Sequence, residues 1–455
     1  MSSPHKKGII ELDGICYKAN NSSCKAVVIE SPTATRHIQI PATITDANQR
    51  EFTVTEILHA AFEGAKIRSI HFSPDSEITV IGSNSFGLGA TSPIETLELP
   101  PKVVTLRDDW CFNTPKVKLI QLSSKNKNYI LTDNDNNKIG SNQDNNLETE
   151  EEEAEKETIN EGCILYNADF TVLYFVCRNV KRLVIPSTVK RIASSACQFA
   201  QIEELVFEEG SQLEEIERSA FFGCKLTSLN NIPKSVRIIG DFAFNSNRLL
   251  EKVTFEEESQ LQYIGVGAFA SCGLKGRKCF ICPSNQISKL EKGCFESNKK
   301  LIYVVFENAK AIEIGANSFR DTSKRPISGV VLGSKTKVKG KGVPTNTFHL
   351  NEGQTIDDIK DIYKSEIGKG DEEEEEEEEA NQEEIENNDI QDAEKIEPQA
   401  EIIEEEDEDD ELEKALLSLD DDGEDINLLD QNYQDLKSRD VDILLENNEE
   451  EDIDA

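Results

Sequence analysis

The sequence predicts a β-rich α/β solenoid, in which short units of similar sequence stack into a right-handed coil. The first observation is a fixed period: a closing apolar position recurs at Cys197, Phe221, Phe244, Phe269, Phe295 and Phe319, at intervals of 24, 23, 25, 26 and 24 residues. The second is that the units open with an alternating apolar triplet and carry another apolar pair midway. The third is that no single unit could bury its own apolar residues, so neighbouring units must stack.

The unit that begins at Leu183-Val-Ile-Pro186 shows why each part takes its place. The alternating apolar residues form a strand with one buried side, and proline ends the strand because it has no N–H to donate. Val189 and Ile192 form the return leg of the coil. Where a unit contains Ile239-Gly240, glycine permits a turn that other residues resist. The closing pair of that unit, Ala243-Phe244, fills the core from the far side.

The same pattern extends toward both ends of the chain, with one interruption. The expected order is an N-terminal cap (1–29), a first set of repeats (30–132), a disordered insertion rich in Asn and acidic residues (133–161), a second set of repeats (162–350), a C-terminal cap or linker (351–370) and an acidic tail (371–455). The insertion is expected to be disordered because it has little to bury. Beyond it, Cys163–Tyr166 and Val172–Phe175 predict a hairpin.

The end of the chain differs in composition from the repeats. Residues 371–455 hold 41 of the chain's 88 acidic residues and 4 of its 49 basic residues, so most of the formal net charge of −39 belongs to this tail. Blocks of like charge repel one another, which predicts a disordered acidic tail. Between the repeats and the tail, Ile356–Ile367 is expected to form a short helix that caps the coil.

Two apolar groups interrupt the acidic tail. Leu412, Ala415, Leu416 and Leu419 recur at the spacing of one helix face, and Ile443-Leu-Leu445 forms a second group. One interpretation is that both are short linear elements that become ordered on contact with a partner. The alternative is that both are accidents of spacing in a low-complexity tail, and the sequence does not decide between them.

Neither the histidines nor the cysteines form a catalytic or metal-binding pattern. The histidines are scattered at His5, His37, His59, His71 and His349. The single C-x-x-C, Cys279-Phe-Ile-Cys282, lacks the further ligands that a zinc site needs. It also lies on an expected strand, where residues three apart point to opposite sides. We therefore expect no enzymatic activity, no cofactor and no metal.

The eleven cysteines and the apolar runs bear on location. Most cysteines occupy core positions of the repeat, where free cysteine behaves as a small hydrophobic residue, and their odd number fits a reducing compartment. No apolar run is long enough to cross a bilayer, and the first residues lack the apolar core of a signal peptide. These features favour a cytoplasmic monomer, and the acidic tail should repel nucleic acid rather than bind it.

Binding to other proteins is the function that the repeats themselves favour. Between the two inward residues of each expected strand lies one that faces outward, and in the second set of repeats these are mostly β-branched: Val184, Val206, Thr254, Ile281, Val305 and Val331. In the first set the equivalent residues are polar: Gln39, His71, Glu98 and Gln121. An exposed apolar row on a sheet is a candidate partner surface. The alternative is that β-branched residues suit any sheet surface.

The repeats resemble the BspA-type leucine-rich repeat. The resemblance is carried by Ile185-Pro-Ser-Thr-Val189 with Ile192, and by Ile232-Pro-Lys-Ser-Val236 with Ile239-Gly240 and Ala243-Phe244, and it covers roughly residues 30–350. The sequences of Phe207–Leu213 and Phe255–Leu261 are most similar to those of BspA-like proteins of trichomonad protists. This resemblance implies a surface antigen or adhesin without catalytic residues. The resemblance therefore implies association with the cell surface. The long acidic tail is a departure from such proteins, which often carry a membrane span instead.

The layout of leucine-rich repeats followed by an acidic segment is also similar to that of the acidic leucine-rich nuclear phosphoproteins. That similarity implies an intracellular scaffold or chaperone, which would bind basic proteins through the tail. Such binding would depend on salt, because exposed charges are screened by ions.

Overall fold

The computed structural model describes residues 8–89, 92–139, 159–324, 328–351 and 354. These residues form 32 strands and contain no helix, so the described fold is a β-solenoid and the α component of the expected class is corrected. The reason lies in the second half of each repeat. It folds as a two- to four-residue strand and tight turns with left-handed residues, which leaves no run of helical backbone. The predicted helix at 356–367 lies outside the described residues.

The chain begins with an antiparallel meander that leads into parallel coils. β1 (Ile9–Leu12), β2 (Ile15–Asn20) and β3 (Lys25–Val28) are antiparallel neighbours, and β3 then pairs in parallel with β6 (Glu51–Ile57). This sheet continues through β8 (Val80–Ile81) and β10 (Thr105–Leu106), while β5 (Thr43–Thr45) pairs with β6. The opposite wall contains β4 (Thr35–Ile40) with β7 (Lys66–Phe72), and β9 (Thr96–Glu98) with β11 (Leu119–Ser123) and β13 (Ile159–Gly162).

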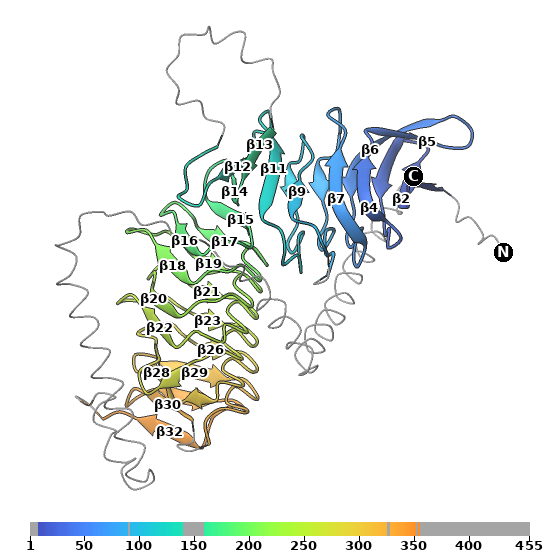
Figure 1. The fold of residues 1–455 in the computed structure, drawn as a ribbon. Coiled ribbons are helices and arrows are strands. Elements are labelled where there is room, and N and C mark those ends of the chain that lie inside the picture. The colour runs from blue at the N-terminus through green and yellow to red at the C-terminus, as the bar shows by residue number, and fades with distance from the viewer. Residues whose placement is uncertain (1–7, 90–91, 140–158, 325–327, 352–353, 355–455) are drawn as a thin grey trace, which may run out of the picture. The chain divides into compact units, whose positions relative to one another are not determined.

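The second set of repeats has two walls of strands (Figure 1). One is a ten-stranded sheet: β12 (Tyr129–Thr132), β14 (Ile164–Asn167), β15 (Val172–Val176), β17 (Arg191–Ile192), β19 (Glu215–Ile216), β21 (Ile238–Ile239), β23 (Tyr263–Ile264), β26 (Lys289–Leu290), β29 (Ala311–Ile314) and β31 (Lys337–Lys339). The first three strands are antiparallel, so the predicted hairpin is present as β14 and β15, and the remaining pairs are parallel.

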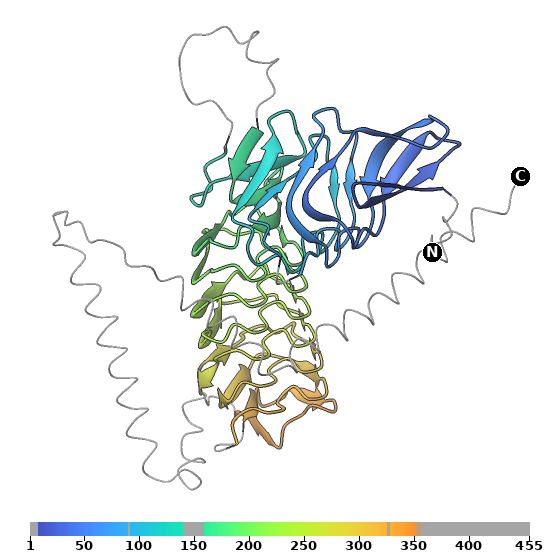
Figure 2. The same ribbon diagram turned by 45° about the vertical axis from the view of Figure 1, so that its right-hand side comes forward.

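The other wall contains β16 (Arg182–Ile185) with β18 (Glu204–Phe207), then β20 (Ser228–Ile232), β22 (Lys252–Phe255), β25 (Phe280–Ile281), β28 (Tyr303–Phe306), β30 (Gly329–Leu332) and β32 (Asn346–His349). β24 (Lys275–Gly276) and β27 (Lys300–Leu301) form a separate parallel pair, and each directly precedes a strand of this wall in the chain. We call the outward side of the strands from β16 to β32 the strand face. Figure 2 shows these strands along one side of the coils and the narrow turns along the other.

The turns opposite the strand face are stacked through a column of phenylalanine rings. The ring of Phe244 lies 5.2 Å from that of Phe221 and 5.3 Å from that of Phe269, with nearly parallel planes. The backbone there repeats as well: Ser219 and Gly223 are both left-handed, and the N–H of Phe221 donates to the carbonyl of Ala243 in the next coil at 2.8 Å. Each coil therefore provides the surface on which the next is built.

Two parts of the predicted insertion belong to the fold. Residues 159–161 form β13 with Gly162, antiparallel to β11, and the side chain of Gln121 donates to Glu161 at 2.7 Å. Residues 133–139 form a turn in which Asn136 donates to the carbonyl of Val184 at 2.9 Å. The expectation of disorder is wrong for these residues, because pairing and polar contacts hold them against neighbouring strands. Residues 140–158 lie outside the described part.

Side chains join the two sets of repeats. Asp109 accepts a hydrogen bond from Ser195 Oγ at 2.5 Å. It also forms an ion pair with Arg218, whose Nη1 lies 3.0 Å from the other carboxylate oxygen. The N–H of Asn113 donates to the side chain of Gln198 at 2.9 Å. These contacts bring together residues that are 85 to 109 positions apart. The coil that ends the first set thus rests on a coil of the second.

Candidate functional site

The structure aligns the predicted apolar row along the strand face. Val184 pairs with Val206 across β16 and β18, and Thr254 pairs with Ile281 across β22 and β25. All four side chains are half-buried, as expected for residues that stand on a sheet without a full layer above them. Parallel strands are about 4.8 Å apart, so these side chains form closely spaced rungs.

A bulge in β20 interrupts the row between Val206 and Thr254. Asn230 and Asn231 are inserted between the two inward residues of the strand, Leu229 and Ile232, and both asparagines are exposed. Asn231 has a left-handed backbone, with φ of 53°, and its N–H donates to Thr254 Oγ1 at 2.9 Å. The row therefore has a polar notch at this coil.

The last two residues of the predicted row do not reach solvent. Ile281, Val305 and Val331 are register partners, but Val305 is 1% exposed and Val331 is 0% exposed. They belong to a separate apolar cluster with Ile302, Tyr303 and Leu350, against which Ile281 and Phe348 pack. The expectation that Val305 and Val331 are open is wrong, because other apolar side chains gather on the same side of the sheet. Continuous apolar runs in β28 and β30, rather than alternation, were the sequence signal for burial on both sides.

Charged and polar groups flank the open part of the row. Arg182 and Glu204 form an ion pair of 2.9 Å between β16 and β18, and both side chains are more than half exposed. Lys275 and Glu251 form a second pair of 3.1 Å. An apolar centre with a polar margin is the usual composition of a protein-binding surface.

Two of the equivalent positions in the first set of repeats, His71 and Glu98, contact each other. His71 Nδ1 lies 2.9 Å from a carboxylate oxygen of Glu98, whose other oxygen accepts the N–H of Phe72 at 3.2 Å. His37 Nδ1 lies 2.8 Å from Ser69 Oγ. These contacts link adjacent coils, so the polar residues have a structural role there.

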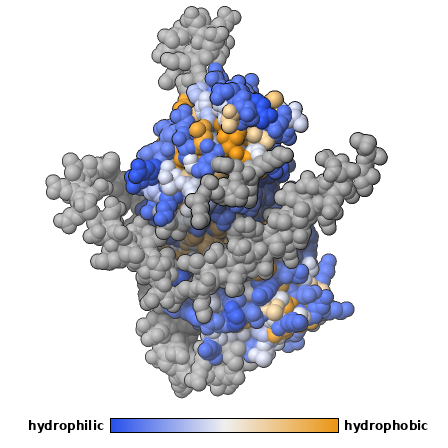
Figure 3. Space-filling view, turned by 90° about the vertical axis from the view of Figure 1, so that its right-hand side faces the viewer, coloured by the Kyte–Doolittle hydropathy of each residue, from blue (hydrophilic) through white to orange (hydrophobic). Residues whose placement is uncertain are grey.

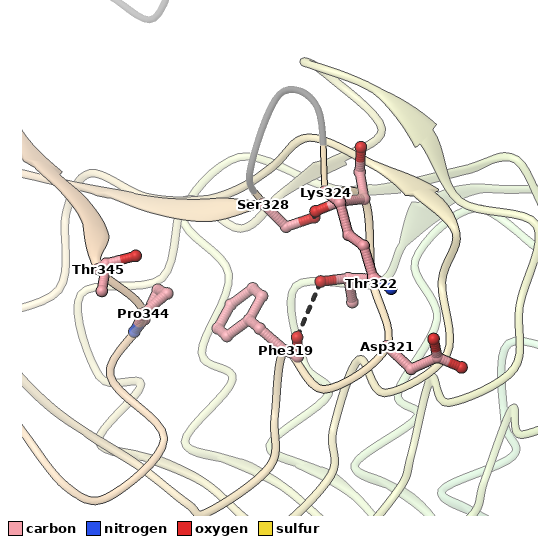
Figure 4. A pocket seen from close by; sticks show the side chains of 8 residues that line it. Phe319, Asp321, Thr322, Lys324, Ser328, Pro344 and Thr345 are labelled. Atoms are coloured by element: carbon pink, nitrogen blue, oxygen red, sulfur yellow. Dashed lines mark hydrogen bonds between the residues drawn. The ribbon is translucent and has the colours of Figure 1, made fainter.

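A pocket of about 410 Å³ lies at the end of the phenylalanine column. Figure 4 shows Phe319 between Pro344 and Thr322, whose hydroxyl donates to the carbonyl of Phe319 at 2.8 Å. The Phe319 ring is 5.9 Å from that of Phe295 and is only half-buried, since among the described residues no further phenylalanine of the column stacks on it. The pocket thus marks the end of the repeat pattern, and its lining carries no histidine or cysteine.

The cysteines of the predicted C-x-x-C are core residues. Cys279 and Cys282 are both buried, and burial raises the pKa of each thiol to about 12. Within residues 8–89, 92–139, 159–324 and 328–351, no group of three or more His, Cys, Asp or Glu side chains could hold a metal ion. All eleven cysteines are free thiols.

Sequence reasoning missed the buried charge at the joint between the repeat sets. Arg178 is 2% exposed, stacks on the Phe175 ring at 4.2 Å and donates to the carbonyls of Val176 and Ala196 at 3.0 and 3.1 Å. Burial lowers the pKa of this guanidinium. Arg178 Nε also donates to the carbonyl of Thr114 in the first set at 3.3 Å, so this side chain links the two sets of repeats. No local pattern in the sequence marks it.

On the side drawn in Figure 3 the coloured surface is largely hydrophilic, with apolar patches in its upper and lower parts. The large exposed apolar residues are dispersed at Leu12, Leu58, Val104, Ile159, Ile238 and Leu249. The candidate tail motif, Leu412, Leu416 and Leu419, lies outside the described residues. No helix in the described part of the chain is long and apolar enough to span a bilayer.

Comparison with solved structures finds several bacterial proteins that are similar to this chain. The solved structures that resemble it include a leucine-rich repeat protein from Eubacterium ventriosum (14% identity, 69% of this chain and 94% of that chain, TM-score 0.39). Another is from Bacteroides ovatus (17% identity, 76% and 91%, TM-score 0.37). A third is a leucine-rich cell surface protein from Faecalibacterium prausnitzii (14% identity, 76% and 97%, TM-score 0.33).

A comparison with curated protein sequences finds no significant match. The model of the BspA type leucine rich repeat region matches six copies, over residues 36–134, 171–279 and 214–351. These matches include the coils that carry the strand face and cover more than half of the chain. The chain therefore belongs to the family of BspA-type leucine-rich repeat proteins.

Proposed function

We propose that the protein is a non-catalytic interaction module, and that the strand face from Val184 to Ile281 binds a protein partner. The observation that carries this proposal is the half-buried row of Val184, Val206, Thr254 and Ile281, held in line by strand register. Such side chains lose their remaining contact with water when a partner covers them, which favours association. The polar notch at Asn230 and the flanking ion pairs supply the directional contacts that distinguish one partner from another.

The experiment that tests this face introduces charge into the row. Val184→Glu combined with Val206→Glu places two carboxylates at half-buried outward positions without altering the inward core residues. The matched control is Ile238→Glu combined with Leu249→Glu, which adds the same charge at exposed apolar positions away from the row. Val305 is unsuitable for this test because it is fully buried.

Full-length protein is used to capture partners from cell extract, and cross-links between bait and partner are mapped by mass spectrometry. We expect cross-links near β16 to β25, loss of capture by the Val184/Val206 variant and retention by the control. A charge in a desolvated interface is costly, which accounts for the expected loss. Retained capture by the Val184/Val206 variant would exclude the row as the binding surface.

The acidic tail supports a second candidate function, binding of basic proteins. Its 41 acidic residues against 4 basic ones provide a strong negative potential. Core histones serve as the probe and polylysine as the control for unspecific attraction. Binding at low salt should weaken as salt rises and be lost when residues 371–455 are deleted. Undiminished binding after that deletion would contradict a role for the tail, including its Leu412, Leu416 and Leu419 motif.

The two candidates also differ in the cell compartment that they require. A surface antigen or adhesin would be stained by antibody on intact cells, whereas an intracellular scaffold would be stained only after permeabilisation. We propose a cytoplasmic location because the many free thiols fit a reducing compartment. Staining of intact cells would overturn that placement and favour the adhesin form of the function.

A further inference from the structure

We propose that Cys163 and Cys177 form a modification site, at which a small organic disulfide oxidises the two thiols to an intramolecular disulfide bond. The site lies at the open end of the hairpin of β14 and β15 and does not involve the strand face. It is therefore independent of the proposed function, and a failure of either leaves the other standing.

Strand register places the two cysteines opposite each other. The last paired residues at this end of the hairpin are Ile164 and Val176. Cys163 and Cys177 are the next residues outward, and the N–H of Cys177 donates to the carbonyl of Cys163 at 2.8 Å. Residues opposed in antiparallel strands have Cα atoms about 4.5–5.5 Å apart, and disulfides usually span about 4.4–6.8 Å between Cα atoms. The backbone thus already has the separation that a disulfide needs.

The two thiols also contact each other through a side-chain hydrogen bond. This bond lowers the pKa of Cys163 from 9.0 to about 7, and it raises the pKa of Cys177. Cys177 therefore keeps its proton and donates it to the Cys163 sulfur. A thiolate at Cys163 is well populated near neutral pH, and the thiolate is the nucleophile of disulfide exchange.

Access to solvent distinguishes this pair from other cysteines of the chain. Cys163 is half-buried, whereas Cys177 is 0% exposed. Cys279 and Cys282 are buried at both positions, and burial raises the pKa of each thiol to about 12. Cys24 is exposed, but it lies in the turn between β2 and β3, whose other residues are not cysteines. Cys163 combines an accessible sulfur with a second thiol in contact.

The oxidation proceeds in two balanced steps. The Cys163 thiolate attacks one sulfur of the small disulfide, forms a mixed disulfide and expels the other half as a thiolate. Cys177 then attacks Cys163 Sγ, the bond to the small molecule breaks, and the second half leaves with the proton of Cys177. Two protein thiols are oxidised, and one small disulfide is reduced to two thiols. Because the exchange is reversible, an excess of a small thiol restores both cysteines.

The first step removes the obstacle to the second. The hydrogen bond to Cys163 is the largest cause that raises the pKa of Cys177, and burial is the next. Once Cys163 Sγ is bonded to another sulfur, it no longer carries the charge that holds the Cys177 proton. The buried guanidinium of Arg178, the next residue in the chain, favours the Cys177 thiolate.

The new bond would fasten the hairpin beside the contact that links the two sets of repeats. Arg178 donates to the carbonyl of Val176 in β15 and to that of Thr114 in the first set. A covalent loop from Cys163 to Cys177 restricts the unfolded chain, which stabilises the folded one. The oxidised protein should therefore unfold at a higher denaturant concentration than the reduced protein. An equal midpoint for the two forms would contradict this effect of the bond.

Oxidised glutathione is the probe, and the folded full-length protein is the target. Trypsin cleaves after Lys156 and Arg178, so both cysteines of the site are released in one peptide. By mass spectrometry we expect this peptide to lose the mass of two hydrogen atoms and to resist alkylation until a reductant is added. Cys24 is the internal control. It should retain glutathione as a mixed disulfide, since no cysteine lies opposite it in the described structure.

Two variants separate the steps. With Cys177→Ala, the reaction should stop after the first step, and Cys163 should retain glutathione. With Cys163→Ala, Cys177 should remain unmodified because it is buried. Unchanged emission of Trp110, which is 2% exposed, shows that each variant is folded.

Four results with the wild-type protein would overturn the proposal. An unmodified peptide would show that the Cys163 thiol is not accessible. A mixed disulfide that persists at Cys163 would show that the two sulfurs cannot meet. A disulfide from either residue to another cysteine, or between two chains, would show that the hairpin does not set the pairing. Equal rates of closure in the folded protein and in urea would show that strand register contributes nothing.

Discussion

Replacement of Phe244 by alanine tests whether the coils hold one another through the phenylalanine column. Phe244 is 0% exposed, and its ring lies between those of Phe221 and Phe269, at 5.2 and 5.3 Å. Replacing a fully buried phenylalanine by alanine typically lowers the free energy of unfolding by about 3–5 kcal/mol. The favourable burial of the ring is lost, and a cavity remains in the core. Because a repeat contacts only its neighbours, this loss should fall on the coils around residues 219–271.

The free energy of unfolding can be measured by denaturant titration of the full-length chain, followed by far-UV circular dichroism. Phe244→Ala should lower it by about 3–5 kcal/mol. The double variant Phe244→Ala with Phe269→Ala should lower it by less than the sum of the single changes, with a coupling of about 0.5–1.5 kcal/mol between the stacked rings.

The control is Leu249→Ala, because this side chain lies nearby in sequence but is 54% exposed. Its effect should remain within about 0.5 kcal/mol. A loss at Phe244 no larger than that at Leu249, or strict additivity of Phe244 and Phe269, would refute the view that the column carries the stacking energy.

Two further predictions concern the joint and the thiols. Asp109→Ala leaves Ser195 and Arg218 without their shared acceptor. It should therefore lower the free energy of unfolding by about 1–3 kcal/mol, measured from the unfolding transition of Trp110 fluorescence. An unchanged transition would contradict this role of Asp109. The hydrogen bond from Cys177 lowers the pKa of Cys163 from 9.0 to about 7, so its thiolate forms as the pH rises through about 7. Alkylation of Cys163 should be half-maximal near that pH, and Cys177→Ala, which removes the donor, should move the midpoint upward, whereas a wild-type midpoint near 9 would contradict the contact.

The sequence was sufficient to predict those parts of the fold that depend on local periodicity. Leu183, Ile185, Val189 and Ile192 are all 0% exposed, as their alternation and spacing required. The hairpin of β14 and β15 was likewise visible, because two apolar strands flank a short polar turn. In each case the residues that form the element are neighbours in the chain.

Contacts between distant residues were not predictable in this way. The ion pair of Asp109 and Arg218 joins coils that are separated by the insertion, and a period of about 24 residues does not reveal which coils meet there. The burial of Val331 depends on Tyr303, Phe348 and Leu350, which reach the same side from other strands and from the chain beyond them. Strand register aligns Val184 with Val206 and Thr254 with Ile281, but tertiary packing decides which outward residues remain open.

Carbene footprinting of the full-length protein, with and without its captured partner, tests the open and closed parts of the strand face together. We expect a small photo-activated diazirine to label the peptides that contain Val184, Val206 and Ile281 in the free protein, and the partner to protect them. The peptides that contain Val305 and Val331 should stay unlabelled in both states. Strong labelling of Val305 and Val331, or protection by the partner only at sites away from Val184 to Ile281, would contradict the account.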